Sequence, residues 1–221
     1  MKLIRALWGN RNDIRNEIPI KPKHDEIVYV WGKDNLHYVK SLGYETRFVQ
    51  NTVKADYKYK LDAIDLAYEE FGKILFLDWD CIQIKSIDGL EFNSPSMPLY
   101  SYPKNHIQPY IKLQKQIKEY SWDFGESYVI PNACCISVEG FNLGKELKKI
   151  HSKYKFHTLV EEFAFKLFTN CSLDEYIQNY DSPYLYGRED SQDFIINGNR
   201  VNTSMKLNKY IGNKNKRFIH E

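Results

Sequence analysis

The chain has 221 residues, and its 31 Lys and Arg against 29 Asp and Glu give a net charge of only +2. An apolar fraction of 43% with 15% aromatic residues argues against disorder and favours one globular domain. The balanced charge provides no overall field that would select nucleic acid or an anionic membrane. The N-terminal segment is too short and polar for a signal peptide, and no apolar run reaches the roughly 18 residues of a membrane span, so we expect a cytoplasmic protein.

Strand and helix signals alternate in the first half of the chain. Apolar and β-branched runs predict strands at 3–8, 26–31, 46–49 and 74–77, and apolar periodicity predicts helices at 34–43 and 57–71. Asp34 is the expected N-cap of the first helix, and Gly72 the expected end of the second. The run 74–77 is apolar at every position, which is typical of a strand in a parallel sheet. The first third therefore predicts a βαβ layout with a mostly parallel sheet.

The second half of the chain is less regular. Strands are predicted at 97–102, 128–138 and 217–221, and helices at 106–120, 142–154 and 158–168. The stretch 180–199 is rich in Gly, Asp, Ser and Asn, which predicts a long loop or short irregular elements. No repeat or linker interrupts the chain, so we expect a single α/β domain over residues 1–221, with helices flanking the sheet and a mixed C-terminal half.

Two carboxylates follow the buried strand, in the motif Asp78-Trp79-Asp80. Ligands gather at the carboxyl ends of parallel strands. Because side chains alternate along a strand, Asp78 and Asp80 are expected on one side, with Trp79 facing the core on the other. Carboxylate oxygens at this spacing suit a hard divalent cation, bound directly by one and through water or a ribose hydroxyl by the other.

The cysteines and most of the histidines carry no metal-binding pattern. Cys81, Cys134, Cys135 and Cys171 form no CxxC pair and are expected to be buried thiols in a reducing compartment. Five histidines lack ligand spacing with one another and are expected at the surface or in packing: His24, His37, His106, His151 and His157.

Four features in this order resemble the nucleotide-sugar glycosyltransferases of the GT-A fold. They are the DxD motif at 78–80, the segment 131–135 (PNACC), which is similar to an acceptor-side strand, the acidic pair Glu161-Glu162, and the C-terminal His220. The resemblance implies a GT-A-like, Rossmann-like sheet with a nucleotide-binding half at 1–102 and an acceptor-side half at 103–221. It also implies transfer of a sugar from a nucleoside diphosphate sugar, with UDP as the expected nucleotide.

The resemblance assigns roles to particular residues. Asp80 and His220 would hold Mn²⁺ or Mg²⁺, with Asp78 completing the metal site through water or binding the ribose. Trp8 would stack on the nucleobase, and Lys60 would contact the phosphates. On the acceptor side, Asn132 and Glu161 would contact the acceptor and Glu162 would act as general base. The acceptor would be a surface glycan or a modified DNA base.

Other interpretations stay open at the level of sequence. A strand ending in DxD also opens the haloacid-dehalogenase phosphatases, in which the first Asp is the nucleophile and the second the acid/base. A non-catalytic nucleotide-binding protein is a further alternative. Trp8 would also serve as core packing, Lys60 as a solvated helix lysine, and Glu161 or Glu162 as a helix-dipole partner. The acidic stretch 189–193 competes for a site role, and the basic stretches 145–149 and 206–217 fit either a polyanion such as DNA or a solvated face.

Overall fold

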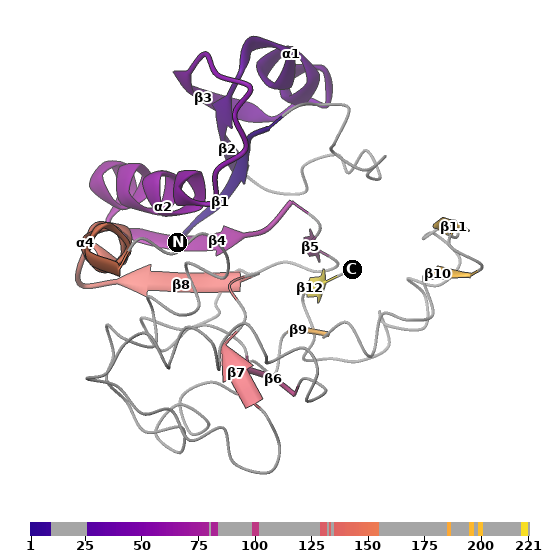
Figure 1. Ribbon diagram of the computed structural model, residues 1–221. Helices are drawn as coiled ribbons and strands as arrows, with labels where there is room; N and C mark the ends of the chain where they lie inside the picture. The colour runs from indigo at the N-terminus through magenta and orange to yellow at the C-terminus, as the bar shows by residue number, and fades with distance from the viewer. Residues whose placement is uncertain are drawn as a thin grey trace.

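The computed structural model (Figure 1) describes residues 1–9, 26–79, 81–83, 99–101, 129–131, 133, 135–154, 185–186, 195–196, 199–200 and 218–220. Side chains are described within 1–9, 26–79, 133, 135–149 and 151–152. The helices predicted at 106–120 and 158–168 lie outside these residues. Among the described helices, none is both long and apolar enough to cross a membrane.

A five-stranded sheet forms the centre of the described structure (Figure 1). Its order is β3 (Glu45–Gln50), β2 (Glu26–Trp31), β1 (Lys2–Leu7), β4 (Lys73–Leu77) and β8 (Cys135–Glu139). The pairs β1–β2, β2–β3 and β1–β4 are parallel, and β4–β8 is antiparallel. The predicted α/β fold with a mostly parallel sheet is therefore confirmed, and the strand that precedes Asp78 lies inside the sheet.

Two helices cover opposite faces of this sheet. On one face, Trp31 of β2 stacks on Tyr59 of α2 (Lys58–Phe71), with ring centroids 4.9 Å apart. On the other face, Leu7 and Val30 pack with Val39 of α1 (Lys33–Ser41). Strand alternation explains the division, since successive side chains of β1 and β2 point to opposite faces. Both strands are buried on both sides, which is the reason that most of their residues are apolar, with Arg5 and Glu26 as the buried exceptions.

Glycines set two of the helix boundaries. Gly32 has φ 91° between β2 and α1, and its carbonyl accepts the Leu36 amide at 3.1 Å. The helix therefore begins at Lys33, and the prediction that Asp34 is its N-cap is wrong, because the chain has already turned at Gly32 and Asp34 lies in the first turn. Gly72 ends α2 in the left-handed conformation at φ 69°, as predicted.

The predicted strand 128–138 is two strands in different sheets. β7 (Val129–Pro131) pairs antiparallel with β6 (Leu99–Ser101), whereas β8 pairs with β4. Pro131 ends β7, since proline has no amide hydrogen for a further ladder bond, and Ala133 lies in a turn. The division brings the turn, rather than a continuous strand, to the end of β4.

Short strands continue the chain after α4 (Leu143–Tyr154). β12 (Phe218–His220) lies between β5 (Cys81–Gln83) and β9 (Leu185–Tyr186) in a three-stranded sheet, and β10 (Ile195–Ile196) pairs with β11 (Asn199–Arg200). The stretch 180–199 thus includes short irregular elements, one of the two forms predicted for it. The terminal strand predicted at 217–221 is confirmed at 218–220.

Helices α2 and α4 pack side by side at very close range (Figure 1). A Cβ atom added at Gly144 would lie 2.8 Å from the carbonyl oxygen of Leu61 and 2.9 Å from the Cα of Asp65, and closer still to the Asp65 nitrogen. Polar contacts flank this point, where Lys148 Nζ reaches Asp62 at 2.9 Å and Asp65 at 2.7 Å. Glycine is therefore required at 144 to let the two backbones meet.

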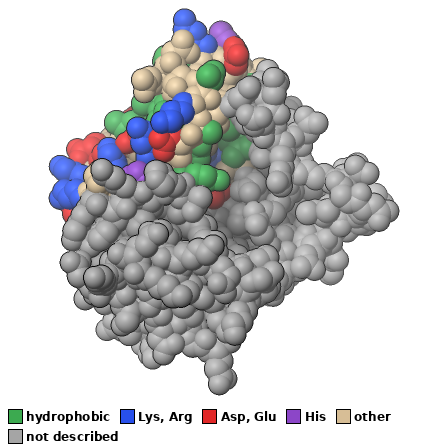
Figure 2. Space-filling model, in the orientation of Figure 1, with side chains coloured by type: hydrophobic (Ala, Val, Ile, Leu, Met, Phe, Trp, Pro, Cys, Tyr) green, Lys and Arg blue, Asp and Glu red, His purple; other side chains and the backbone are tan. Residues whose placement is uncertain are grey.

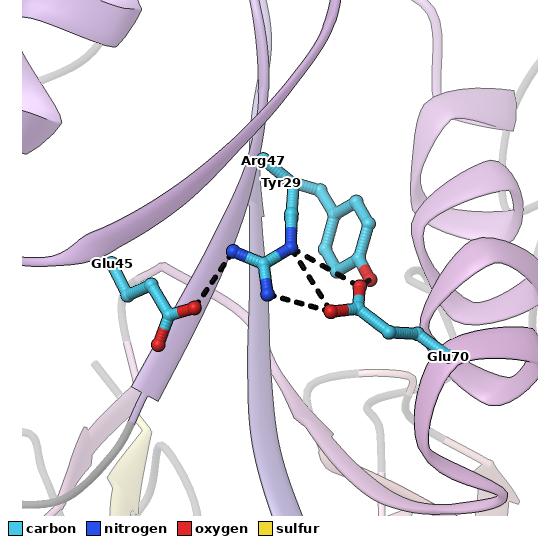
Figure 3. Close-up of polar contacts among 4 residues, drawn as sticks. All are labelled: Tyr29, Glu45, Arg47 and Glu70. Carbon is cyan, nitrogen blue, oxygen red and sulfur yellow. Dashed lines mark hydrogen bonds and ion pairs between the residues drawn. The ribbon is translucent and has the colours of Figure 1, made fainter.

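A polar clamp ties the edge strand β3 to α2 (Figure 3). Arg47 donates through Nε and Nη2 to both oxygens of the Glu70 carboxylate, at 2.6 to 3.2 Å, and through Nη1 to Glu45 at 2.7 Å. The Tyr29 hydroxyl donates to Glu70 at 2.8 Å. The hydrogen bonds from Arg47 hold the pKa of Glu70 below its ordinary value.

We expect the clamp to stabilise the fold in a pH-dependent way. Because the pKa of Glu70 is lower in the folded chain, its contribution is complete above the ordinary carboxyl pKa and is lost as the pH falls through the lowered value. For this partly exposed pair, the coupling free energy between Glu70→Gln and Arg47→Met should be about 0.5 to 1 kcal/mol at neutral pH. Denaturant unfolding of the four proteins of a double-mutant cycle, at neutral and acid pH, measures it. A coupling that is the same at both pH values would contradict the assignment.

Candidate active site

Asp78 follows β4 directly, at the edge where the parallel strands β1, β2 and β4 end. Its carboxylate pairs with the ammonium of Lys60, with Nζ 2.8 Å from Oδ1 and 3.0 Å from Oδ2. The Lys60 side chain is only 4% exposed and the Asp78 side chain 25% exposed. Lys60 comes from the first turns of α2, which places its ammonium beside the end of β4. The alternative interpretation of Lys60 as a solvated helix lysine is therefore wrong, because Lys60 is a buried partner of the motif.

The same ammonium joins the DxD motif to the segment 131–135. Lys60 Nζ donates to the carbonyl oxygen of Ala133 at 3.4 Å. Ala133 is 1% exposed and precedes β8, whose first residue, Cys135, is a buried residue paired with Leu77 of β4. Two segments singled out in the sequence analysis thus meet at one side chain.

A buried ion pair lies directly beneath Asp78. Arg5 of β1 donates from Nε to Oε2 of Glu26 at 2.8 Å, and from Nη1 to the main-chain carbonyl of Asp78 at 2.7 Å. Both charged side chains are 1% exposed. Nearby, burial raises the pKa of Tyr44 to about 12, with the Arg5 charge acting against this shift and Glu26 adding to it. The ion pair therefore lies on the same face of the sheet as Tyr44 and α1.

Trp79 anchors the motif on the α1 face. Its ring lies 5.6 Å from the ring of Tyr44 and 6.4 Å from that of Tyr38, between centroids. It packs against the apolar cluster that contains Val28 and Val39. The prediction that Trp79 faces the core is confirmed. Asp78 and Trp79 therefore point to opposite faces of the sheet, with Asp78 toward Lys60 and Trp79 toward α1.

Trp8 follows β1 at the same edge and is partly exposed. Its indole meets the ring of Tyr57 in an edge-on arrangement, with centroids 6.2 Å apart. Tyr57 is 54% exposed and immediately precedes α2. Because Trp8 is not enclosed in the core and has an exposed aromatic neighbour, the pair has accessible ring surface for a flat ligand.

The backbone of His220 lies next to the DxD motif. In the antiparallel pair β5–β12, His220 is the partner of Cys81, which directly follows Asp80. The prediction that the terminal strand docks, rather than frays, is therefore confirmed for its backbone. The side chain of His220, Asp80, Asn132, Glu161 and Glu162 all lie outside the described part of the structure, as does the acidic stretch 189–193.

The described residues at this edge supply only part of the donor set that a divalent cation needs. Within the described side chains no group of three His, Cys, Asp or Glu residues forms a metal-binding cluster. The Asp78 carboxylate supplies oxygen donors of the type Mg²⁺ and Mn²⁺ prefer, but it already faces the Lys60 ammonium. This arrangement favours Asp78 as an outer residue of a metal site rather than a direct ligand.

The basic stretch 145–149 is largely neutralised by neighbours. Lys148 pairs with Asp62 and Asp65, and Lys149 pairs with Glu146 at 2.6 Å. Figure 2 shows blue and red side chains intermixed in the described part of the surface. These ion pairs favour a solvated helix face over a polyanion-binding patch. The stretch 206–217 lies outside the described residues.

Sequence reasoning missed Tyr57 at this edge and the ion pair of Arg5 and Glu26, which reaches the Asp78 carbonyl from within the sheet. The signal for the ion pair was present, because a charged residue inside a strand buried on both faces has to find a partner. Tyr57 stood at the predicted start of α2, where nothing distinguished it from other exposed tyrosines.

No protein-family model matches the sequence, and no curated protein matches it. Among solved structures, the chain is similar to mouse xyloside xylosyltransferase 1 in its apo form, with 11% identity and a TM-score of 0.41, over 100% of this chain and 97% of that one. It is also similar to an active-site mutant of LgtC, with 13% identity and a TM-score of 0.46, over 100% of this chain and 86% of that one. Identities this low carry no information about substrate or reaction, which have to be inferred from the chain's own residues.

Proposed function

We propose that the chain is a metal-dependent glycosyltransferase that moves a sugar from a nucleoside diphosphate sugar to an acceptor hydroxyl. UDP is the expected nucleotide, and a surface glycan or a modified DNA base the expected acceptor. The observation that carries the proposal is the meeting of Asp78, Lys60 and Ala133 at the carboxyl edge of the sheet. It joins the motif expected to hold the donor to the segment expected to face the acceptor.

Each residue has a defined task in the proposal. Asp80 and His220 would hold Mn²⁺ or Mg²⁺, which when bound neutralises charge on the departing diphosphate. The strand pairing of His220 with Cys81, the residue after Asp80, supports the assignment of Asp80 and His220 to one metal site. Asp78, oriented by Lys60, would bind the ribose or a metal-bound water. Trp8 with Tyr57 would offer ring surface to the nucleobase. On the acceptor side, Asn132 and Glu161 would contact the acceptor hydroxyl, and Glu162 would take its proton.

Calorimetry with UDP tests the donor site. We expect wild-type protein to bind UDP in the presence of Mn²⁺, and removal of the metal or the change Asp80→Ala to weaken binding by at least about tenfold. Glu139→Gln is the matched control, since it removes a carboxylate paired with Lys73 at the opposite end of β4. UDP binding that ignores both the metal and Asp80→Ala would refute the proposed site.

Activity assays separate the proposed function from its alternatives. Slow hydrolysis of a UDP-sugar, dependent on Mn²⁺ and lost in Asp80→Ala, would support the transferase and identify the sugar. Hydrolysis of a generic phosphomonoester would instead favour the phosphatase, with Asp78 as nucleophile. Binding of UDP without either reaction would favour a nucleotide-binding protein.

A further inference from the structure

The adjacent strands β1 and β2 each place one charged residue in the buried core of the sheet. β1 lies between β2 and β4, and all its residues except Lys2 are buried. Arg5 and Glu26 are 1% and 2% exposed as residues, and their side chains meet at 2.8 Å. Leu3 is the strand partner of Glu26, so strand alternation places Leu3, Arg5 and Glu26 on one face. The pair thus occupies two buried positions of a kind that apolar side chains usually fill.

Such a pair is a poor way to stabilise a fold. Removing two charges from water costs about as much as their attraction returns, and apolar residues of similar volume often serve equally well or better. An apolar pair would lack the hydrogen bond from Arg5 Nη1 to the carbonyl of Asp78, at 2.7 Å. That carbonyl belongs to the peptide group between Asp78 and Trp79, inside the DxD motif.

We propose that Arg5 and Glu26 are positioning residues that fix the Asp78–Trp79 peptide group and so set the direction of the Asp78 carboxylate. The planar guanidinium of Arg5 donates one hydrogen bond to the Glu26 carboxylate and another to the Asp78 carbonyl. Glu26 orients the guanidinium and offsets its charge, so that Arg5 would repel less strongly a cation held at the proposed donor site. The consequence for ligand binding rests on the proposed donor site, whereas the consequence for the peptide group does not.

The main experiment replaces the pair as a whole. In Arg5→Met/Glu26→Leu, the two charges that face each other are removed together, so we expect a folded protein with a melting temperature close to that of the wild type. We nevertheless expect faster amide hydrogen exchange in the segment 74–79, and Mn²⁺-dependent UDP binding weakened by about tenfold, as for outer-shell partners of metal sites. A folded double variant whose exchange in this segment equals that of the wild type would overturn the proposal.

Two further variants keep the test decisive. Arg5→Lys keeps the charge but loses the planar guanidinium, and we expect the same local increase in exchange even if the double variant fails to fold. Unchanged exchange in Arg5→Lys would also overturn the proposal. Ile4→Val is the control, because it perturbs the same buried strand on its opposite face, and it should leave exchange at 74–79 and UDP affinity unchanged.

The two readouts distinguish the two proposals. Faster exchange at 74–79 in the double variant, together with wild-type protein that binds no UDP, would support the positioning role and refute the donor site. Intact UDP binding by the wild type with no change in exchange or affinity in the double variant would refute the positioning role and leave the donor site standing.

Discussion

Replacement of Gly144 by alanine is expected to lower the free energy of unfolding by about 3 kcal/mol, at the upper end of the usual cost of overpacking. The new Cβ would meet backbone atoms of α2, at 2.8 Å from the Leu61 oxygen and 2.9 Å from the Asp65 Cα. Backbone atoms inside a helix cannot rotate away as a side-chain end can. The two helices would therefore have to separate, which would also weaken the contacts of Lys148 with Asp62 and Asp65.

Urea unfolding measures this loss, with Lys145→Ala as the control. Lys145 is the next residue of α4 and is exposed, so alanine there adds no contact and should change the free energy of unfolding by less than about 0.5 kcal/mol. A Gly144→Ala variant as stable as the control would mean that α2 and α4 do not approach as closely as described.

Lys60→Met is expected to reduce the rate of UDP-sugar hydrolysis by about 100-fold or more, the usual effect of removing one charged or hydrogen-bonding group from a preorganised site. Methionine fills a similar volume but leaves the Asp78 carboxylate without the ammonium that holds both of its oxygens. It also removes the bond to Ala133 that joins the two halves of the proposed site.

Two other lysine substitutions test whether the loss of rate is specific to the charge at Lys60. Lys60→Arg retains a positive charge and should recover part of the rate. Lys58→Met removes a lysine of the same helix whose side chain is 47% exposed, and it should leave the rate unchanged. Hydrolysis by Lys60→Met at the wild-type rate would contradict the role given to the ammonium.

The parallel part of the sheet was predictable because each of its strands is marked by local sequence. The run 74–77 has no polar residue, and β2 is a β-branched and aromatic run whose predicted bounds, 26–31, are the observed ones. The split of 128–138 was not predictable in the same way. Its two parts share apolar character, and only their separate partners, β6 and β4, reveal two strands.

The candidate site could also be predicted only in part from the sequence. The position of Asp78 at the carboxyl edge of β4 followed from strand period and sheet type, and the inward direction of Trp79 followed from alternation. The partners of Asp78, Lys60 and Arg5, could not be predicted, because they come from other elements and no spacing rule connects them with residue 78. The same holds for Ala133, which contacts Lys60. A buried arginine shows that a partner exists without showing which one it is.

The antiparallel β8 also determines the order in which the fold is completed during synthesis. β4 ends at Leu77 and β8 begins at Cys135, so residues 78–134 must be made before the β8 side of β4 is covered. At about 5 to 20 residues per second, the ribosome needs roughly 3 to 12 seconds for this stretch. Throughout that interval the nascent chain carries an open edge on an apolar strand, the feature through which sheets pair with other chains. We therefore expect the chain to be more prone to aggregate while residues 78–134 are being made than after β8 has paired with β4.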